Sequence, residues 1–319
     1  MEHKIAWFTE GGWQGKVPRD HPNMRNDMAW MHTLDVTHYP IPMASQITEN
    51  FDIGIITLPK THIDKLIQLD TMKEIKRVCK KVGTMQEGPH WYFQDYTMEQ
   101  QIWFYNILSE LDFIWCHNEI DKKYYRGLTN KKCYVNPTLM IEDNIKPVEV
   151  KNKSGVIIGG NMVRWYGGFD SYIIAQEFDE DIYAPSMGRK IDREDEMDIN
   201  HLPYMTWVEW INNLSKYKYG VHLMPTWAAG TFTLNCAYHG IPCIGYKGLD
   251  TQHLHPSLSV DYGDLDEAKI LAKRLKIDEE FYKKCSKECK NLYRNSSFRE
   301  KQNIYTMNKV IGEVINETN

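Results

Sequence analysis

The sequence has 319 residues, of which 42% are apolar and 25% charged, and its net charge is −5. This length accommodates two domains of ordinary size, and the composition is that of a folded protein. The acidic balance argues against a chain whose main task is to grip nucleic acid, because such proteins usually carry a basic surface. No stretch approaches the ~18 consecutive apolar residues of a membrane helix.

The cysteines and the start of the chain indicate a compartment. The seven cysteines form no CxxC pair, and an odd number cannot all form disulfides within one chain. The first residues lack the apolar core of a secretion signal. We therefore expect a cytoplasmic protein without a membrane span, located in the host cytoplasm if the chain is viral.

Short apolar runs and helical periods alternate over the first 140 residues. This pattern predicts a parallel sheet with helices on both of its faces. The turn Gly11-Gly12 follows the first strand and can approach a ligand closely. Strands are predicted at 4–8, 36–41, 53–58, 82–86, 112–116 and 133–137, and helices at 26–34, 62–81, 98–111 and 119–128.

The second half repeats this alternation after a polar segment. Residues 141–154 contain a proline and no helical period, so they are interpreted as an interdomain linker. Thr206 and Glu209 form a capping box for a helix at 207–217. Further strands are predicted at 155–158, 181–185, 221–224, 242–246 and 258–262, and further helices at 231–239, 264–275, 278–294 and 298–314.

The segment 221–245 is the most informative part of the chain. It combines an apolar run, a turn with Pro225 and Gly230, a helix that starts near Thr231, and a second apolar run. In a parallel sheet this arrangement places the helix start at the carboxyl edge, where open α/β sheets bind ligands. The N–H groups of Gly230, Thr231, Phe232 and Thr233 suit a phosphate there. The alternative is that Thr231 only caps a helix.

The order small–Gly–x–aromatic–x–Leu–x–x–Ala–x–x–Gly–x–Pro–x–Ile in this segment resembles the donor-binding signature of GT-B glycosyltransferases. The positions are filled by Ala229, Gly230, Phe232, Leu234, Ala237, Gly240, Pro242 and Ile244. The resemblance implies an α/β protein with two Rossmann-like domains, parallel sheets and a cleft between them. It also implies a nucleotide-sugar co-substrate, for which we expect a UDP-sugar, and no resident cofactor.

The same resemblance implies a division of the chain. Residues 1–140 would form the acceptor-binding domain and 155–297 the donor-binding domain, joined by the linker at 141–154. Residues 298–319 would form a helix that crosses back to the first domain.

The donor site is expected to contain an arginine. Arg164, and secondarily Arg189, suits a diphosphate because a planar guanidinium can bind two oxygens at once. The alternative for Arg164 is an arginine on a surface loop.

The glycines that open the second domain, Gly159 and Gly160, do not satisfy GxGxxG, because the next glycine is Gly167. The predicted donor-binding residues are Gly159, Gly160, Asn161, Arg164, Arg189, Tyr204, Thr226, Gly230, Thr231, Phe232, Thr233 and Asn235. Trp165 and Trp207 are additional candidates for stacking on the nucleobase, against the alternative that they belong to the core.

Many retaining GT-B enzymes carry two glutamates eight residues apart, and the matching positions here are Trp227 and Asn235. We therefore expect an inverting transfer, which needs a general base for the acceptor hydroxyl. Glu87 follows a predicted strand and is the first candidate. Asp20 and His90 are its rivals. Gly11, Gly12, His21 and Trp91 are the predicted acceptor-binding residues.

No metal site is predicted. The acidic run 179–181 precedes a strand instead of ending one, and His253 and His255 have no third ligand beside them.

The acceptor stays open between a glycan, a small molecule and a modified DNA base. One alternative is a phage enzyme that glycosylates 5-hydroxymethylated pyrimidines, which would need a basic patch around Lys16, Arg19 and Arg25. Another is a catalytically inactive protein that binds sugar nucleotides or glycans.

Overall fold

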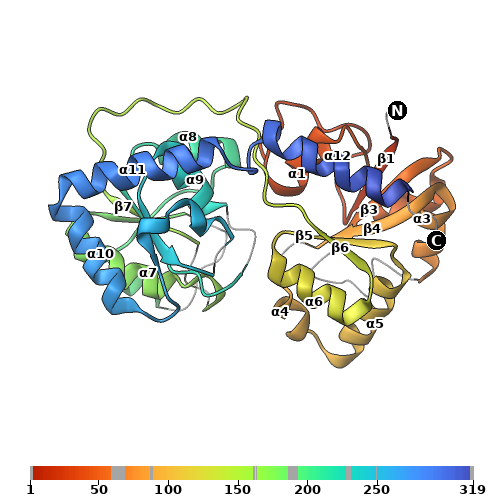
Figure 1. The fold of residues 1–319 in the computed structure, drawn as a ribbon, viewed down its shortest axis with the longest axis horizontal. Helices are drawn as coiled ribbons and strands as arrows, with labels where there is room; N and C mark the ends of the chain where they lie inside the picture. Colours follow the sequence, from red (N-terminus) through yellow and green to blue (C-terminus); the bar gives the residue numbers. More distant parts are fainter. Residues whose placement is uncertain are drawn as a thin grey trace. The chain divides into compact units, whose positions relative to one another are not determined.

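The computed structural model describes residues 3–58, 69–86, 89–160, 162, 164–185, 193–227, 231–248 and 250–316, and only the backbone of residues 92, 94 and 164. The chain forms two compact units (Figure 1). The first unit comprises Met1–Ile141 and Glu300–Asn319, and the second comprises Glu142–Arg299. Each unit contains a six-stranded sheet in which all paired strands run parallel.

The sheet of the first unit has the strand order β2-β1-β3-β4-β5-β6. Because the chain adds β2 on one side of β1 and β3 on the other, the strand order reverses between β1 and β3. The strands are β1 (Ile5–Thr9), β2 (Thr37–Pro40), β3 (Phe51–Thr57), β4 (Cys79–Met85), β5 (Phe113–Cys116) and β6 (Lys132–Val135). The helices are α1 (Asn26–Thr33), α3 (Leu69–Val78), α4 (Trp91–Gln94), α5 (Met98–Glu110), α6 (Glu119–Thr129) and α12 (Glu300–Asn316).

Both faces of the first sheet are packed. On one face, Trp7 and Trp115 contact Trp30 of α1 with ring centroids 6.4 and 5.7 Å from it. On the other face, buried apolar side chains of α3, α5 and α6 cover the strands. The strands therefore read as nearly continuous apolar runs, as expected for a parallel sheet buried on both sides.

Two local predictions for the first unit are wrong. The helix expected at 62–81 ends at Val78 in the described part, and residues 79–81 already belong to β4. Cys79 is buried and pairs with Phe51 of β3, so sheet pairing overrides the predicted helical period. The segment after β4, expected as a loop, contains the short helix α4.

The second sheet has the order β12-β11-β10-β7-β8-β9. Its strand order reverses between β7 and β10. The strands are β7 (Val156–Ile158), β8 (Ile182–Ala184), β9 (Asn200–His201), β10 (Tyr219–His222), β11 (Cys243–Tyr246) and β12 (Ser259–Val260). The helices are α7 (Gly168–Ala175), α8 (Trp207–Leu214), α9 (Phe232–His239), α10 (Leu265–Ile277) and α11 (Glu279–Arg294).

The second unit is also layered. Side chains of α7, α10 and α11 share one buried cluster with the sheet, and side chains of α8 and α9 contribute to another. The predicted capping box at the start of α8 is confirmed: the Thr206 hydroxyl accepts from Glu209 N, and the Glu209 side chain accepts from Thr206 N. The short edge strand β9 was not predicted.

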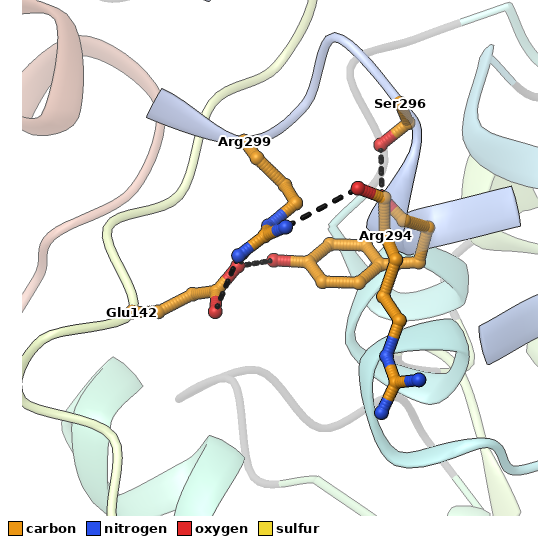
Figure 2. A network of polar contacts seen from close by, with 5 residues as sticks. Glu142, Arg294, Ser296 and Arg299 are labelled. Carbon is orange, nitrogen blue, oxygen red and sulfur yellow. Dashed lines mark hydrogen bonds and ion pairs between the residues drawn. The ribbon is translucent and has the colours of Figure 1, made fainter. Parts of the chain in front are cut away.

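An ion pair joins the first and last residues of the second unit (Figure 2). Arg299 Nε lies 2.6 Å from Glu142 Oε1, and the Tyr293 hydroxyl donates to the same oxygen over 2.7 Å. The carboxylate of Glu142 raises the pKa of Arg299. This unit is thus closed where the chain enters and leaves it.

Among the described helices of the whole chain, none has the length and apolar character needed to cross a membrane.

Candidate donor and acceptor sites at the carboxyl edges of the sheets

The carboxyl edge of the second sheet is shaped by glycines at the point where the strand order reverses. Such reversal points are where open α/β sheets bind ligands. Gly159 follows β7 directly, and a Cβ there would lie 2.4 Å from Cγ of His222 at the end of β10. Gly160 has φ +70° and packs against Tyr166. Gly167 has φ +62°, and a Cβ there would lie 1.8 Å from the carbonyl oxygen of Leu223. Side chains at these positions would prevent the two loops from approaching.

The helix that follows β10 begins with backbone donors that precede its first described helical hydrogen bond. Within the described residues, the first helical hydrogen bond of α9 runs from Asn235 N to Thr231 O, so the N–H groups of Phe232, Thr233 and Leu234 precede it. Thr231 occupies the N-cap position, yet its side chain makes no capping hydrogen bond. The first turn contains no acidic residue. The positive end of the helix dipole is therefore not neutralised locally, which favours an anionic ligand.

Two buried polar side chains beside this helix start have no hydrogen-bond partner among the described residues. Both ring nitrogens of His222 and both amide atoms of Asn235 make no hydrogen bond within the described chain. Both residues are 3% exposed or less. The ring of Phe232 packs edge-on against His222 at 5.1 Å. Burial lowers the pKa of His222 to about 3, so the imidazole is neutral near pH 7. Unpartnered buried polar groups are costly, and a ligand that pairs with them would remove that cost.

The other predicted donor residues differ in their contacts and exposure, and some lie outside the described residues. The Thr226 hydroxyl donates to the Trp165 carbonyl over 3.3 Å, which joins the loops that follow β10 and β7. Tyr204 is 74% exposed and precedes α8, whereas Trp207 is buried in the core, as the alternative predicted. Gly230, Asn161, Arg189 and the Arg164 side chain lie outside the described residues.

Aromatic and histidine side chains gather at the carboxyl edge of the first sheet. Gly12 has φ +108°, and a Cβ added there would lie 3.4 Å from Cε1 of the His38 ring. The Trp13 ring lies 4.5 Å from the ring of His38 and 5.5 Å from that of His21. His38 Nε2 is 2.7 Å from Thr9 Oγ1 at the end of β1. Two predicted acceptor residues, Gly12 and His21, are therefore close together. His38 was not predicted as a site residue, because no motif along the chain marks it.

A histidine–carboxylate pair follows β4. The backbone N and the Nδ1 of His90 lie 3.0 and 2.8 Å from Oδ1 of Asp121 in α6. Asn118, the N-cap residue of α6, donates to Oδ2 of the same carboxylate over 2.9 Å. Trp91, the predicted acceptor residue next to His90, begins α4. The pattern Asn-x-x-Asp is the signal that could have indicated the fixed carboxylate, because Asn118 caps the helix that Asp121 enters.

Of the two other candidates for the general base, the structure describes only Asp20. Glu87 lies outside the described residues. Asp20 occupies an exposed turn in the loop after β1.

The sequences considered for metal binding serve structural roles. Asp179 forms an ion pair with Lys276, and Glu180 accepts from Gly155 N. His255 is buried and uses both ring nitrogens, one with Thr233 O and one with Cys243 N. In the described chain, no three His, Cys, Asp or Glu side chains are arranged to hold a metal ion.

No protein-family model matches the sequence, and no curated protein sequence matches it. Solved structures do match the fold. HepE of Anabaena in complex with UDP and glucose aligns with 98% of this chain and 100% of its own, with a TM-score of 0.68 and 10% identity. An alpha-glucosyltransferase in complex with UDP-glucose and DNA containing an abasic site aligns over 97% and 99%, with a TM-score of 0.63 and 13% identity.

The pneumococcal O-GlcNAc transferase GtfA in complex with UDP and GlcNAc aligns with 87% of this chain, with a TM-score of 0.61 and 10% identity. The chain spans 60% of the length of that transferase. The chain has the GT-B fold. The predicted fold class, with two Rossmann-like α/β units, is thereby confirmed. At such identities a shared fold does not fix the reaction, so the function is argued from the sites.

Proposed function

We propose that this GT-B protein is a glycosyltransferase that moves a sugar from a UDP-sugar to an acceptor hydroxyl. The observation that carries the proposal is the start of α9, at the reversal point of a parallel sheet: its first N–H groups have no helical partner among the described residues, and its first turn contains no acid. A diphosphate leaving group needs donors of this kind, because negative charge builds up on it as the glycosidic bond breaks.

The donor is assigned to the second unit. The N–H groups of residues 230–233 and the Arg164 guanidinium would bind the diphosphate without a metal ion or other cofactor. The amide of Asn235 supplies both a donor and an acceptor, which suits a pair of sugar hydroxyls. HepE and the alpha-glucosyltransferase were both solved with a uridine nucleotide, which supports UDP as the carrier.

We further propose that transfer inverts the anomeric configuration. The two positions at which many retaining GT-B enzymes carry glutamates hold Trp227 and Asn235. Trp227 is 42% exposed, and its indole lies 3.1 Å from the position a Cβ of Gly248 would take. Neither side chain offers a carboxylate to the sugar. An inverting reaction instead needs a base on the acceptor side, and the loop that follows β4 contains Glu87 and His90.

A modified DNA base is the second candidate acceptor, favoured by the likeness to a glucosyltransferase solved with DNA. This acceptor would need a basic patch, but two of the basic side chains expected there form ion pairs with acidic side chains of the first unit. Lys16 Nζ lies 3.0 Å from Asp35, and Arg19 lies 3.4 Å from Glu300. These contacts favour an acceptor that carries less negative charge than a duplex.

The direct test is an incubation of the protein with UDP-glucose, UDP-galactose and UDP-GlcNAc while released UDP is measured. A transferase releases UDP slowly by transfer to water, and faster when its acceptor is added. An oligonucleotide with 5-hydroxymethylcytosine in one arm tests the DNA candidate, and the anomeric configuration of the product by NMR tests inversion. Binding of a UDP-sugar with no release of UDP would instead identify a binding protein.

A further inference from the structure

We propose that His90 is the general base for the acceptor hydroxyl and that Asp121 is the residue that positions it. This inference rests on the proposed glycosyl transfer. The carboxylate of Asp121 is 2% exposed and the His90 side chain 24% exposed, so the acid is buried behind a histidine that reaches the surface of the first unit. The pair follows β4, at the same carboxyl edge that holds the predicted acceptor residues.

The carboxylate is held in one orientation before any substrate binds. Asn118 Oδ1 accepts from Asp121 N over 2.9 Å, and Asn118 Nδ2 donates back to Asp121 Oδ2 over 2.9 Å. The remaining oxygen, Oδ1, accepts from both the backbone N and the Nδ1 of His90. All these groups are fixed by the first turn of α6. The histidine ring is fixed further by stacking on Tyr124, with ring centroids 4.5 Å apart and planes 26° apart.

This geometry determines which ring nitrogen can act as a base. An ionised carboxylate only accepts hydrogen bonds, so Nδ1 of His90 carries the proton in the neutral ring. Nε2 therefore bears the free lone pair, and it makes no hydrogen bond to any side chain or backbone group that the structure describes. Among the described titratable groups, Tyr124 stacks on the His90 ring, and Cys116 at the end of β5 and Tyr125 of α6 interact electrostatically with Asp121. Burial raises the pKa of Asp121, and hydrogen bonds from His90 and Asn118 oppose this rise.

The acceptor oxygen forms a bond to the anomeric carbon, and the bond from that carbon to the phosphate oxygen breaks, so that its electron pair leaves with UDP. Nε2 of His90 takes the acceptor proton, and the resulting imidazolium is stabilised by the Asp121 carboxylate through Nδ1. The proton then passes to water. The same arrangement of histidine and carboxylate supports bases in unrelated folds.

A purely structural role for the pair is a tie between the loop and α6. The backbone N–H of His90 alone would provide that tie, whereas the ring bond additionally selects the tautomer. The two roles differ in one measurable property, since only a base controls the pH dependence of turnover.

The test uses the full chain, with UDP release from the most reactive of UDP-glucose, UDP-galactose and UDP-GlcNAc as the readout. His90→Gln should lower turnover by about 10²–10⁴-fold with unchanged affinity for UDP, and should abolish the fall in rate at low pH. Asp121→Asn should also lower turnover with unchanged affinity for UDP, because the Nδ1 proton of His90 loses the carboxylate that selects its tautomer. His201→Gln is the matched control, since His201 also lies beside a carboxylate, 3.5 Å from Glu194, in the second unit.

Each outcome bears on the inference. Near-normal turnover of His90→Gln, or a strong loss in Glu87→Gln with His90→Gln unaffected, would overturn the role of His90 and leave the proposed transfer standing. No UDP release and no binding of any UDP-sugar by the wild type would overturn both. If Asp121→Asn does not fold, the flat pH profile of His90→Gln still decides.

Discussion

The carboxyl edges of the two sheets are built from different chemical groups. The edge of the second sheet consists of glycines, backbone N–H groups and His222. Burial lowers the pKa of His222 to about 3. The edge of the first sheet consists of side chains that can gain or share a proton, with His38 beside Thr9 and His90 beside Asp121. Backbone donors suit a group whose charge is permanent, such as a diphosphate. Histidine pairs suit proton transfer. The contrast therefore supports a donor on the second unit and an acceptor on the first.

The largest expected effect concerns the glycines of the second unit. Gly167→Ala should destabilise this unit by more than about 3 kcal/mol, because a positive φ costs a non-glycine residue roughly 1–3 kcal/mol and the new Cβ would overlap the Leu223 carbonyl. Urea unfolding measures the change. Gly127→Ala in α6 of the first unit is the control: its Cβ meets no atom within 4 Å, so it should gain roughly 0.5–1 kcal/mol. Equal stability of the two variants would contradict the packing described for the donor edge.

Acid should destabilise the second unit strongly. Burial lowers the pKa of His222 to about 3 and that of His255 to about 4, from the ordinary histidine value of 6.5. Both are neutral in the fold, and the unfolded chain takes up protons below pH 6.5. Their contribution to stability is therefore complete above pH 6.5. Each histidine then withdraws roughly 1.4 kcal/mol per pH unit as the pH falls toward its own pKa.

Thermal unfolding at pH 7.5 and pH 5.0 measures this loss, and hydrogen exchange assigns it to a unit. His222→Gln should reduce the slope by about one proton. A first unit that loses protection before the second unit in acid would contradict the assignment.

Donor affinity should fall moderately when the expected cation is removed. Arg164→Ala should weaken UDP binding by a factor of about 10–100, because a hydrogen bond to a charged group contributes roughly 1.5–3 kcal/mol. Calorimetric titration with UDP measures the change. Arg193→Ala is the control, since Arg193 pairs with Glu196 at the surface of the same unit. If both variants bind UDP as the wild type does, Arg164 does not belong to the donor site.

The smallest expected effect is that of metal removal. A chelator such as EDTA should leave UDP release unchanged, because the helix start and an arginine would replace the metal ion. Loss of UDP release in the chelator, restored by manganese, would sink this prediction.

Much of the fold was predicted from short segments of the sequence. The capping box of α8 and the strand–helix–strand unit around α9 depend on residues close together in the chain, so their positions were predicted to within a few residues. The extent of β4 was missed because Cys79 is fixed by its pairing with Phe51, 28 positions earlier.

The candidate sites were less predictable for the same reason. His90 and Asp121 are 31 positions apart and meet only because β4 and β5 are neighbours in the sheet. His38 meets Trp13 through the pairing of β1 with β2. Spacing along the chain does not encode such contacts. The glycines at 159 and 160 were visible as a pair, but the need for glycine at 159 follows from a side chain on another strand, His222.

The location of the donor is tested most directly by amide hydrogen exchange of the full chain with and without saturating UDP. We expect protection in peptides that cover 156–168 and 222–240, centred on the first turn of α9, and unchanged exchange in peptides that cover 5–25 and 86–96. Protection confined to those first-unit peptides, or none anywhere at saturating UDP, would contradict it.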